Sequence, residues 1–204
     1  MMDRFVYVDT ETTDKTPGQI ARLAFILAED TNITAATNHY FSVGKMSPGA
    51  EAIHHLSPAV LKGLSSGQSF GDTIFNDNML DAFFTYRTFV AHNVAFDLRF
   101  VKAEFERCGH PYTPAKTLCT MKAMTPICRL KGPYGFKWPR VEEALRWLKI
   151  DPQEVLIRAK HLFLPKEVQS PQGVELGFHD ARYDVTAVML IHQWLREREV
   201  ADVV

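Results

Sequence analysis

The stretch "VYVDTETT", residues 6–13, decides the fold. Residues 4–9 have the pattern of a strand that is apolar on both faces, which is typical of the centre of a sheet covered by helices. Asp9 and Glu11 follow, and because side chains alternate along a strand, both point to one side, roughly 7 Å apart. Acids at the carboxyl end of a central strand lie where open α/β sheets bind ligands. A simple turn after the strand is the alternative interpretation.

Composition excludes several classes of protein. The chain has 204 residues, 46% of them hydrophobic, and a formal net charge of -1. The length fits one domain with a sizeable core, and the charge argues against tight, non-specific coating of duplex nucleic acid. Three cysteines without a CxxC pair disfavour a zinc site and a disulfide framework, and predict a reducing, cytoplasmic location. The sequence also predicts no signal peptide and no membrane span.

The order of the expected elements indicates one α/β domain over residues 1–204. Three strands come first and are followed by alternating strands and helices, so we expect a mixed five-stranded sheet flanked by helices. The other expected strands are 20–28, 33–43, 88–92 and "AKTLCTM", and the expected helices are 71–86, 94–108, 139–148, 152–163 and about 180–198. Asn93 is predicted to cap the second of these helices, and Pro139 to occupy the first position of the third.

A third acid occurs in "HNVAFD", residues 92–97. Asp97 falls on the apolar stripe of the helix expected from residue 94, in its first turn. An acid that favours the helix dipole is the alternative interpretation, but that role predicts the solvent side. A buried carboxylate without a partner is very costly, so Asp97 is predicted to have a functional role.

A fourth acid occurs in "HDARYD", residues 179–184. Asp184 heads the apolar stripe of the last helix, and His179 is predicted to precede that helix on a loop. An ordinary exposed loop histidine is the alternative for His179. Asp180 and Arg182 fall off the stripe and are predicted to be solvated.

Four clustered acids would repel one another unless a cation lies between them. Hard divalent metals such as Mg²⁺ or Mn²⁺ take carboxylate oxygens together with water and phosphate oxygens. The sequence therefore predicts a site for two such metals.

The motifs "VDTET", "HNVAFD" and "HDARYD", in this order, resemble the three motifs of the DEDD 3′–5′ exonucleases over about residues 4–198. The histidine five residues before the last acid resembles the DEDDh subgroup, which includes the proofreading epsilon subunits of bacterial replicases. The resemblance implies a ribonuclease-H-like fold and two-metal hydrolysis of nucleic acid from the 3′ end. It further implies four metal ligands and a general base, His179; the ligands are Asp9, Glu11, Asp97 and Asp184.

The resemblance also implies where the substrate binds. "AIHHLS", residues 52–57, is similar to the family's substrate-side loop, with His54 in the place of its usual histidine. Further contacts to the terminal nucleotide are expected from Thr10, Thr12, Thr13, Asn93 and Phe96, although strand-end packing is the alternative for the threonines. Two departures concern substrate choice: "DKTPG" replaces the glycine that often follows the first motif, and residues 151–178 are interpreted as a family-specific insertion.

The function expected from these residues is a metal-dependent 3′–5′ exonuclease acting on single-stranded DNA or frayed 3′ ends. An exoribonuclease or short-oligonucleotide hydrolase with the same site is one alternative. A module that docks a polymerase without cutting is the other, and the complete set of acids argues against it. The stretch "RLKGPYGFKWPR", residues 129–140, could stack bases and hold phosphates. The alternative there is a surface loop whose aromatic side chains fill the core below.

Overall fold

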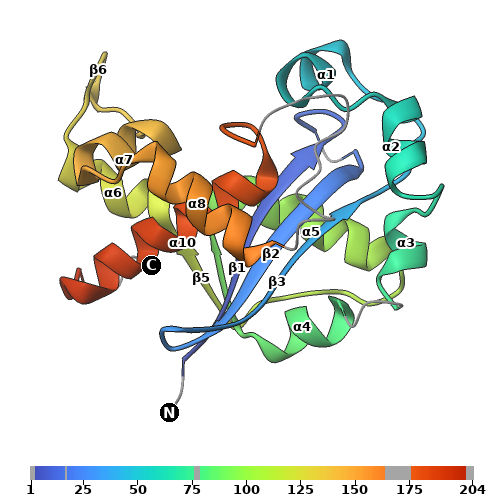
Figure 1. Cartoon of the computed structure of the whole chain (residues 1–204), viewed down its shortest axis with the longest axis horizontal. Coiled ribbons are helices and arrows are strands. Elements are labelled where there is room, and N and C mark those ends of the chain that lie inside the picture. The colour runs from blue at the N-terminus through green and yellow to red at the C-terminus, as the bar shows by residue number, and fades with distance from the viewer. Residues whose placement is uncertain (1–2, 17, 76–78, 164–175, 201–204) are drawn as a thin grey trace.

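The computed structural model describes residues 3–16, 18–75, 79–163 and 176–200, and its centre is a five-stranded sheet (Figure 1). The strands follow the order β3-β2-β1-β4-β5. β1 pairs antiparallel with β2 and parallel with β4, so the sheet is mixed, as predicted. The strand bounds are Arg4–Thr12 (β1), Ile20–Glu29 (β2), Asn32–Tyr40 (β3), Thr88–Ala91 (β4) and Lys116–Cys119 (β5).

Helices cover both faces of the sheet, each over its own hydrophobic cluster. One face carries α6 (Thr120–Cys128), α7 (Val141–Leu148), α8 (Pro152–Leu162) and α10 (Ala181–Glu197). The other carries α3 (Phe70–Thr73), α4 (Met79–Thr85) and α5 (Val94–Arg107). None of the described helices combines the length and the apolar character that crossing a bilayer requires.

The alternation of side chains along β1 decides which face each motif residue meets. Phe5 and Tyr7 belong to the cluster beneath α10, whereas Val6 and Val8 belong to the cluster beneath α5. Continued past the apolar run, the same alternation carries Asp9 and Glu11 to the α10 side and Thr10 to the α5 side.

Two structures flank the carboxyl end of β1, at the top of Figure 1. On one side are α1 (Pro48–His54) and α2 (Pro58–Leu64), whose N-termini are capped by the hydroxyls of Ser47 and Ser57. On the other is a small hairpin of β6 (Lys131–Gly132) and β7 (Gly135–Phe136).

Several predicted elements need correction. The helix predicted at 71–86 is two helices, α3 and α4; the apolar periodicity runs across both because Ile74, Met79 and Phe83 enter the same cluster. Helix α6 was not predicted, because Pro126 lies inside it and a strand was expected to run to its first turn. The helix predicted at 152–163 is confirmed as α8, whereas residues 164–175 of the predicted insertion lie outside the described part of the chain.

One predicted helix start is wrong, and another is correct but lacks a side-chain cap. α7 begins at Val141 rather than at Pro139, because the Glu143 carboxylate accepts a hydrogen bond from the Arg140 N–H (2.9 Å) and caps the helix there. Asn93 does precede α5, but its backbone is left-handed (φ 65°) and its side chain makes no capping hydrogen bond. Asn adopts this conformation more readily than most residues, so the position suits a sharp turn from β4 into α5.

Candidate active site

Three of the four predicted acids meet at the carboxyl end of β1. Carboxylate oxygens of Asp9, Glu11 and Asp184 lie within 4.8 Å of one another. Asp9 and Glu11 come from β1, and Asp184 comes from the first turn of α10, which packs across that face of the sheet. Asp9 and Asp184 are only partly buried, so the group remains open on one side.

The fourth acid, Asp97, approaches from α5 on the opposite face. Its Oδ1 accepts hydrogen bonds from the backbone N–H of Thr10 (3.1 Å) and from the Thr10 hydroxyl (2.8 Å). Both bonds use the same oxygen and therefore fix the orientation of the carboxylate. Asp97 is 4% exposed and lies outside the group of three, yet its charge and that of Asp9 act on each other.

Burial and mutual repulsion make these carboxylates costly to ionise. Burial raises the pKa of Asp9 to about 7, against the opposing effect of the Arg22 guanidinium. Burial, together with the charge of Asp9, also raises the pKa of Glu11, Asp97 and Asp184 well above the ordinary value. A divalent cation among these oxygens would remove both penalties, because it supplies the positive charge that the cluster lacks.

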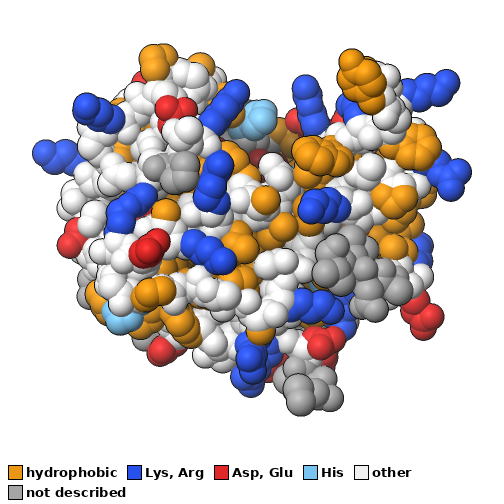
Figure 2. Space-filling view, turned by 180° about the vertical axis from the view of Figure 1, so that it is seen from behind, with side chains coloured by type: hydrophobic (Ala, Val, Ile, Leu, Met, Phe, Trp, Pro, Cys, Tyr) orange, Lys and Arg blue, Asp and Glu red, His pale blue; other side chains and the backbone are white. Residues whose placement is uncertain are grey.

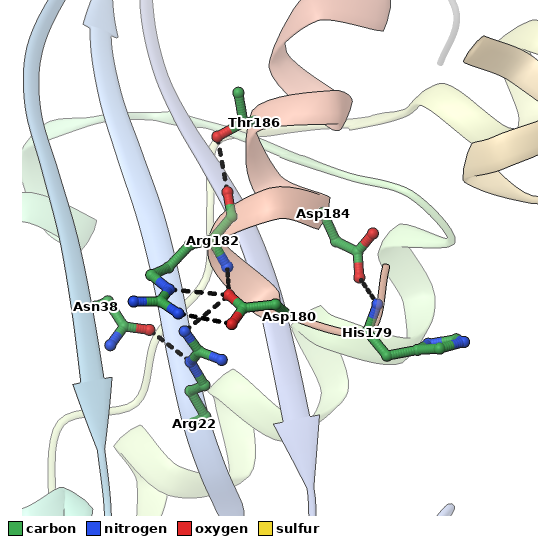
Figure 3. Close-up of polar contacts among 7 residues, drawn as sticks. All are labelled: Arg22, Asn38, His179, Asp180, Arg182, Asp184 and Thr186. Atoms are coloured by element: carbon green, nitrogen blue, oxygen red, sulfur yellow. Dashed lines mark hydrogen bonds and ion pairs between the residues drawn. The ribbon is translucent and has the colours of Figure 1, made fainter. Parts of the chain in front are cut away.

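His179 lies at the rim of the group, just before α10, as predicted. Its side chain is exposed and its backbone is left-handed (φ 65°). The His179 N–H donates a hydrogen bond to Asp184 Oδ2 (3.0 Å), so the loop is tied directly to one of the acids (Figure 3).

Asp180 and Arg182 are buried, which contradicts the prediction that they are solvated. Asp180 Oδ1 accepts from Arg22 Nη2 (2.8 Å) and Arg182 Nε (2.9 Å), and Asp180 Oδ2 accepts from Arg182 Nη2 (2.7 Å). Asn38 of β3 accepts from Arg22 Nε (2.6 Å), so the contacts tie two strands, β2 and β3, to the start of α10 (Figure 3). The apolar stripe of the helix could not reveal that these residues are buried, because their partner, Arg22, comes from the sheet.

Sequence reasoning also missed Arg22, although the sequence carries one signal of its role. It is the single charged residue of "IARLAFILA", and in the β1–β2 hairpin it pairs with Glu11. Paired residues of neighbouring strands point to the same face. Arg22 therefore lies on the acid side of the sheet, where its charge counters the repulsion among the acids.

A cleft of about 310 Å³ opens beside the group of acids. Its lining includes four of the motif residues, Asp9, His92, His179 and Asp184, and in addition Phe178. The far wall comes from residues 138–142, next to the small hairpin. Figure 2 shows a hollow between two lobes of the molecule, with histidine and acidic side chains at its edge.

A second depression, of about 390 Å³, lies on the other side of Glu11, between the end of β1, α1 and α5. Its lining includes Thr10, Thr12, His54 and Phe96 from the predicted substrate-binding residues. His54 is buried, its Nε2 lies 3.3 Å from the Thr12 carbonyl oxygen, and its Nδ1 accepts from the Leu56 N–H. Burial lowers the pKa of His54, so this imidazole is held neutral.

The threonine hydroxyls among the substrate candidates are already hydrogen-bonded within the chain. The Thr13 hydroxyl accepts from the Gln19 N–H (2.9 Å), and the Thr12 hydroxyl donates to the Asp14 carbonyl oxygen (2.8 Å). Together with the Thr10–Asp97 bond, these contacts fit the alternative of strand-end packing. Asn93 is exposed at the turn before α5 and does not line either depression among the described residues.

The donor set suits a hard divalent metal. Carboxylate oxygens at this spacing are the ligands that Mg²⁺ and Mn²⁺ prefer, and the raised pKa values indicate a cluster that needs added positive charge. No cysteine or histidine belongs to the group of three that the described residues form, which disfavours a structural zinc site.

The comparisons with known proteins agree with this geometry. No protein-family model matches the chain. The "3′-5′ exonuclease DinG" of Bacillus subtilis (strain 168) is 28% identical over 147 residues, which are 70% of this chain. The chain spans 15% of that relative's length.

Two solved structures share the fold. Exonuclease X in complex with 5′ overhanging duplex DNA has a TM-score of 0.55 and 21% identity, over 95% of this chain and 92% of that one. The zinc-bound form of the E. coli ExoI–ssDNA complex has a TM-score of 0.64 and 22% identity, over 98% of this chain and 41% of that one.

These matches agree with the motifs and with the mixed sheet between two helical layers. The chain is therefore similar in sequence to a protein named as a 3′–5′ exonuclease, and it shares the ribonuclease-H-like fold of solved exonucleases.

Proposed function

We propose that this chain is a metal-dependent 3′–5′ exonuclease that releases nucleoside 5′-monophosphates from single-stranded DNA or frayed 3′ ends. The observation that carries the proposal is the group of Asp9, Glu11 and Asp184 oxygens, with Asp97 beside it and His179 at its rim. The names of the relatives, which mention 3′-5′ exonuclease activity and complexes with DNA, support the same activity.

The four acids would hold two divalent metals, Mg²⁺ or Mn²⁺, at the carboxyl end of the central strand. When bound, such metals supply an activated nucleophile and stabilise the leaving oxygen. The residues of the chain have separate tasks. Thr10 orients Asp97 through two hydrogen bonds, and Asp184 holds the His179 loop through one.

His179 is the proposed general base. Its imidazole is exposed at the cleft, where it can take the proton of an attacking water molecule, and a neutral imidazole is suited to this near neutral pH. Asp180 directly follows His179, and its bonds to Arg22 and Arg182 hold it in place, which limits how far the His179 loop can shift.

The terminal nucleotide is proposed to bind in the depression lined by Thr10, His54 and Phe96. Its volume of about 390 Å³ lies within the usual range of small-ligand pockets, about 300–1,000 Å³. Ile53 and Phe96 offer apolar surface for a base, and Thr12 and His54 form the polar wall.

The decisive experiment is degradation of 5′-labelled single-stranded DNA and RNA side by side, with Mg²⁺, with Mn²⁺ and with chelator. We expect a DNA ladder that shortens from the 3′ end and stops when the metal is removed. Faster cutting of RNA or of very short oligonucleotides would favour the alternative enzyme. Release of the 5′ label as a mononucleotide from the start would contradict the polarity.

If the chain is a module that binds without cutting, it should bind metal but give no products in any lane.

Unpaired 3′ ends should be cut faster than blunt paired ends, because a chain with a net charge of -1 has little general attraction for duplex. The proposal includes neither RNA as the main substrate nor a polymerase partner.

A further inference from the structure

The β6–β7 hairpin and the residues just after it carry aromatic side chains that are exposed to solvent rather than packed in a hydrophobic core. Tyr134 is 103% exposed, Phe136 55% and Trp138 64%, so these side chains do not fill the core as the alternative interpretation predicted. Tyr134 lies in the turn of the hairpin, Phe136 lies in β7 and Trp138 follows just after it. Exposed aromatic clusters of this kind mark contact surfaces.

The base of the hairpin is fastened to the catalytic motifs. His92 directly follows β4 and opens the motif that contains Asp97. Its Nε2 lies 2.9 Å from the Pro139 carbonyl oxygen and its Nδ1 lies 3.0 Å from the Thr120 hydroxyl. A carbonyl oxygen only accepts, so Nε2 carries the proton and Nδ1 accepts from Thr120. The segment that carries the aromatic side chains is therefore hydrogen-bonded to the motif that contains Asp97.

The hairpin is also continuous with the cleft of the site. Trp138 and Arg140 line the cleft that contains Asp9 and Asp184, and Phe178 lines it from the α10 side. In Figure 1 the hairpin rises on one side of the end of β1, and α1 stands on the other.

Positive charges accompany the aromatic side chains. Arg129, Lys131 and Arg140 are exposed along the same segment, whereas Lys137 is paired with Glu143. Figure 2 shows hydrophobic and basic side chains interleaved over the upper right lobe, where the hairpin lies. Glu142 also lines the cleft, close to the proposed metal ligands. Aromatic faces mixed with cations are the composition of surfaces that bind single strands without reading sequence.

We propose that residues 129–140 form a stacking platform for the single strand on the 5′ side of the scissile bond. The platform rests on the proposed function, in which the depression on the far side of Glu11 binds the 3′-terminal nucleotide. The rest of the strand then leaves through the cleft beside Trp138, where its bases meet the exposed rings and its phosphates meet Arg129, Lys131 and Arg140.

Binding measured in chelator tests the platform without cutting. The probes are a 5′-fluorescein oligothymidylate of about twelve nucleotides and the corresponding dinucleotide, followed by anisotropy. The double variant Tyr134→Ala/Phe136→Ala and the single variant Trp138→Ala should each weaken binding of the longer strand, by about 5- to 100-fold per ring removed. Binding of the dinucleotide should change much less. Phe75→Ala is the matched control, since Phe75 is 58% exposed and does not line either depression.

Hydrolysis with Mg²⁺ separates the platform from the proposed function. The ester of thymidine 5′-monophosphate with p-nitrophenol occupies only the terminal site, so the double variant should hydrolyse it at the wild-type rate. The KM of the same variant for the longer strand should rise by the factor seen in binding. Equal KM and equal affinity in the variant and wild type would overturn the platform while leaving the exonuclease intact. If the wild type cleaves neither substrate, the proposed function fails, and binding in chelator still decides for or against the platform.

Discussion

At the scale of single residues, the site brings together carboxylates that the metal-free protein holds at a cost. Burial raises the pKa of Asp9 to about 7, and it raises the pKa of Asp184 well above the ordinary value. Each acid therefore destabilises the folded metal-free protein and favours the binding of a cation. The two effects can be separated experimentally, because one substitution changes them in opposite directions.

Asp184→Asn should stabilise the metal-free protein and abolish its response to metal. The amide is uncharged, and its oxygen can still accept the hydrogen bond from the His179 N–H. We expect the free energy of unfolding in chelator to rise by about 1–3 kcal/mol, measured by thermal or urea unfolding. Mg²⁺ should then raise the melting temperature of the wild type only. Asp81→Asn, on the exposed side of α4, is the control and should change neither quantity. A lower free energy of unfolding for Asp184→Asn in chelator would show that the negative charge of Asp184 does not destabilise the metal-free protein.

His179→Ala should lower turnover by about 10²–10⁴-fold while leaving metal binding unchanged. The reason is that His179 touches the acids through its backbone N–H, which alanine retains.

His55→Ala is the matched control for that change. His55 is also exposed and left-handed (φ 59° against 65°), so both variants place alanine in the same unfavourable backbone conformation. Metal binding by calorimetry and initial rates should be measured on both. If His179→Ala binds metal as poorly as Asp184→Asn, the histidine is a ligand, and the roles proposed above are wrong.

At the scale of elements, the start of α10 is fixed by a buried ionic cluster. Asp180 is the N-cap of α10, accepts from the Arg182 N–H (3.0 Å) and pairs with Arg22 of β2. Its pKa is lowered: although its burial acts to raise it, the hydrogen bonds and charges of Arg182 and Arg22 prevail. This cluster decides how α10 meets the sheet, and so where Asp184 and His179 lie relative to Asp9.

Asp180→Ala should destabilise the protein by about 3–5 kcal/mol, because it leaves two buried guanidinium groups without this carboxylate. Asp151→Ala is the matched control. Asp151 caps α8 through the same kind of bond, to the N–H two residues later (2.8 Å), but it is exposed and pairs with neither arginine. Its loss should cost about 1 kcal/mol. Urea unfolding of both variants measures the difference, and equal losses would reduce the role of Asp180 to capping alone.

At the scale of the whole molecule, stability should depend on pH and on metal together. The folded chain binds protons at Asp9 near pH 7, whereas an unfolded aspartate does so near its ordinary value of 3.8. Between pH 8 and about 6.5 the folded state therefore takes up more protons than the unfolded state. Lowering the pH through this window should stabilise the metal-free protein.

His192 limits that gain at lower pH. Burial lowers its pKa to about 4, and its Nδ1 lies 2.8 Å from the Tyr7 hydroxyl, as expected for a satisfied core histidine. Below its ordinary value of 6.5 the unfolded chain takes up this proton and the folded chain does not. Stability contributed by His192 is therefore lost as the pH falls from 6.5 towards 4.

Melting temperatures from pH 5 to pH 8, with chelator and with Mg²⁺, test this balance. In chelator the melting temperature should rise as the pH falls from 8 to about 6.5. At pH 8, Mg²⁺ at about 100 times its Kd should raise it by about 5–10 °C. The effect of Mg²⁺ should shrink towards pH 5, as protons compete for the same oxygens. A metal effect that is independent of pH would place the cation away from these acids.

The sequence by itself determined the sheet and the identity of the acids. The unbroken apolar run "FVYV" and the placement of Asp9 and Glu11 on a single face are local properties, because the period of a strand is built into the backbone. The same is true of Asp97 and Asp184, which interrupt apolar stripes at the starts of helices. A costly residue on a core face is visible in the sequence before any partner is known.

Only the tertiary structure decided which residues meet across elements. Asp180 seemed solvated because the stripe of its own helix excludes it, yet Arg22 reaches it from a strand 158 residues away in sequence. The hairpin aromatics could fill a core or face solvent, and the pattern along the chain fits both. The hydrogen bond between His92 and the Pro139 carbonyl oxygen holds this segment beside the cleft, and nothing among the described residues covers the aromatic side chains, so they remain exposed. Periodicity reports which side of an element is apolar, whereas pairing and exposure depend on what the rest of the chain places opposite that side.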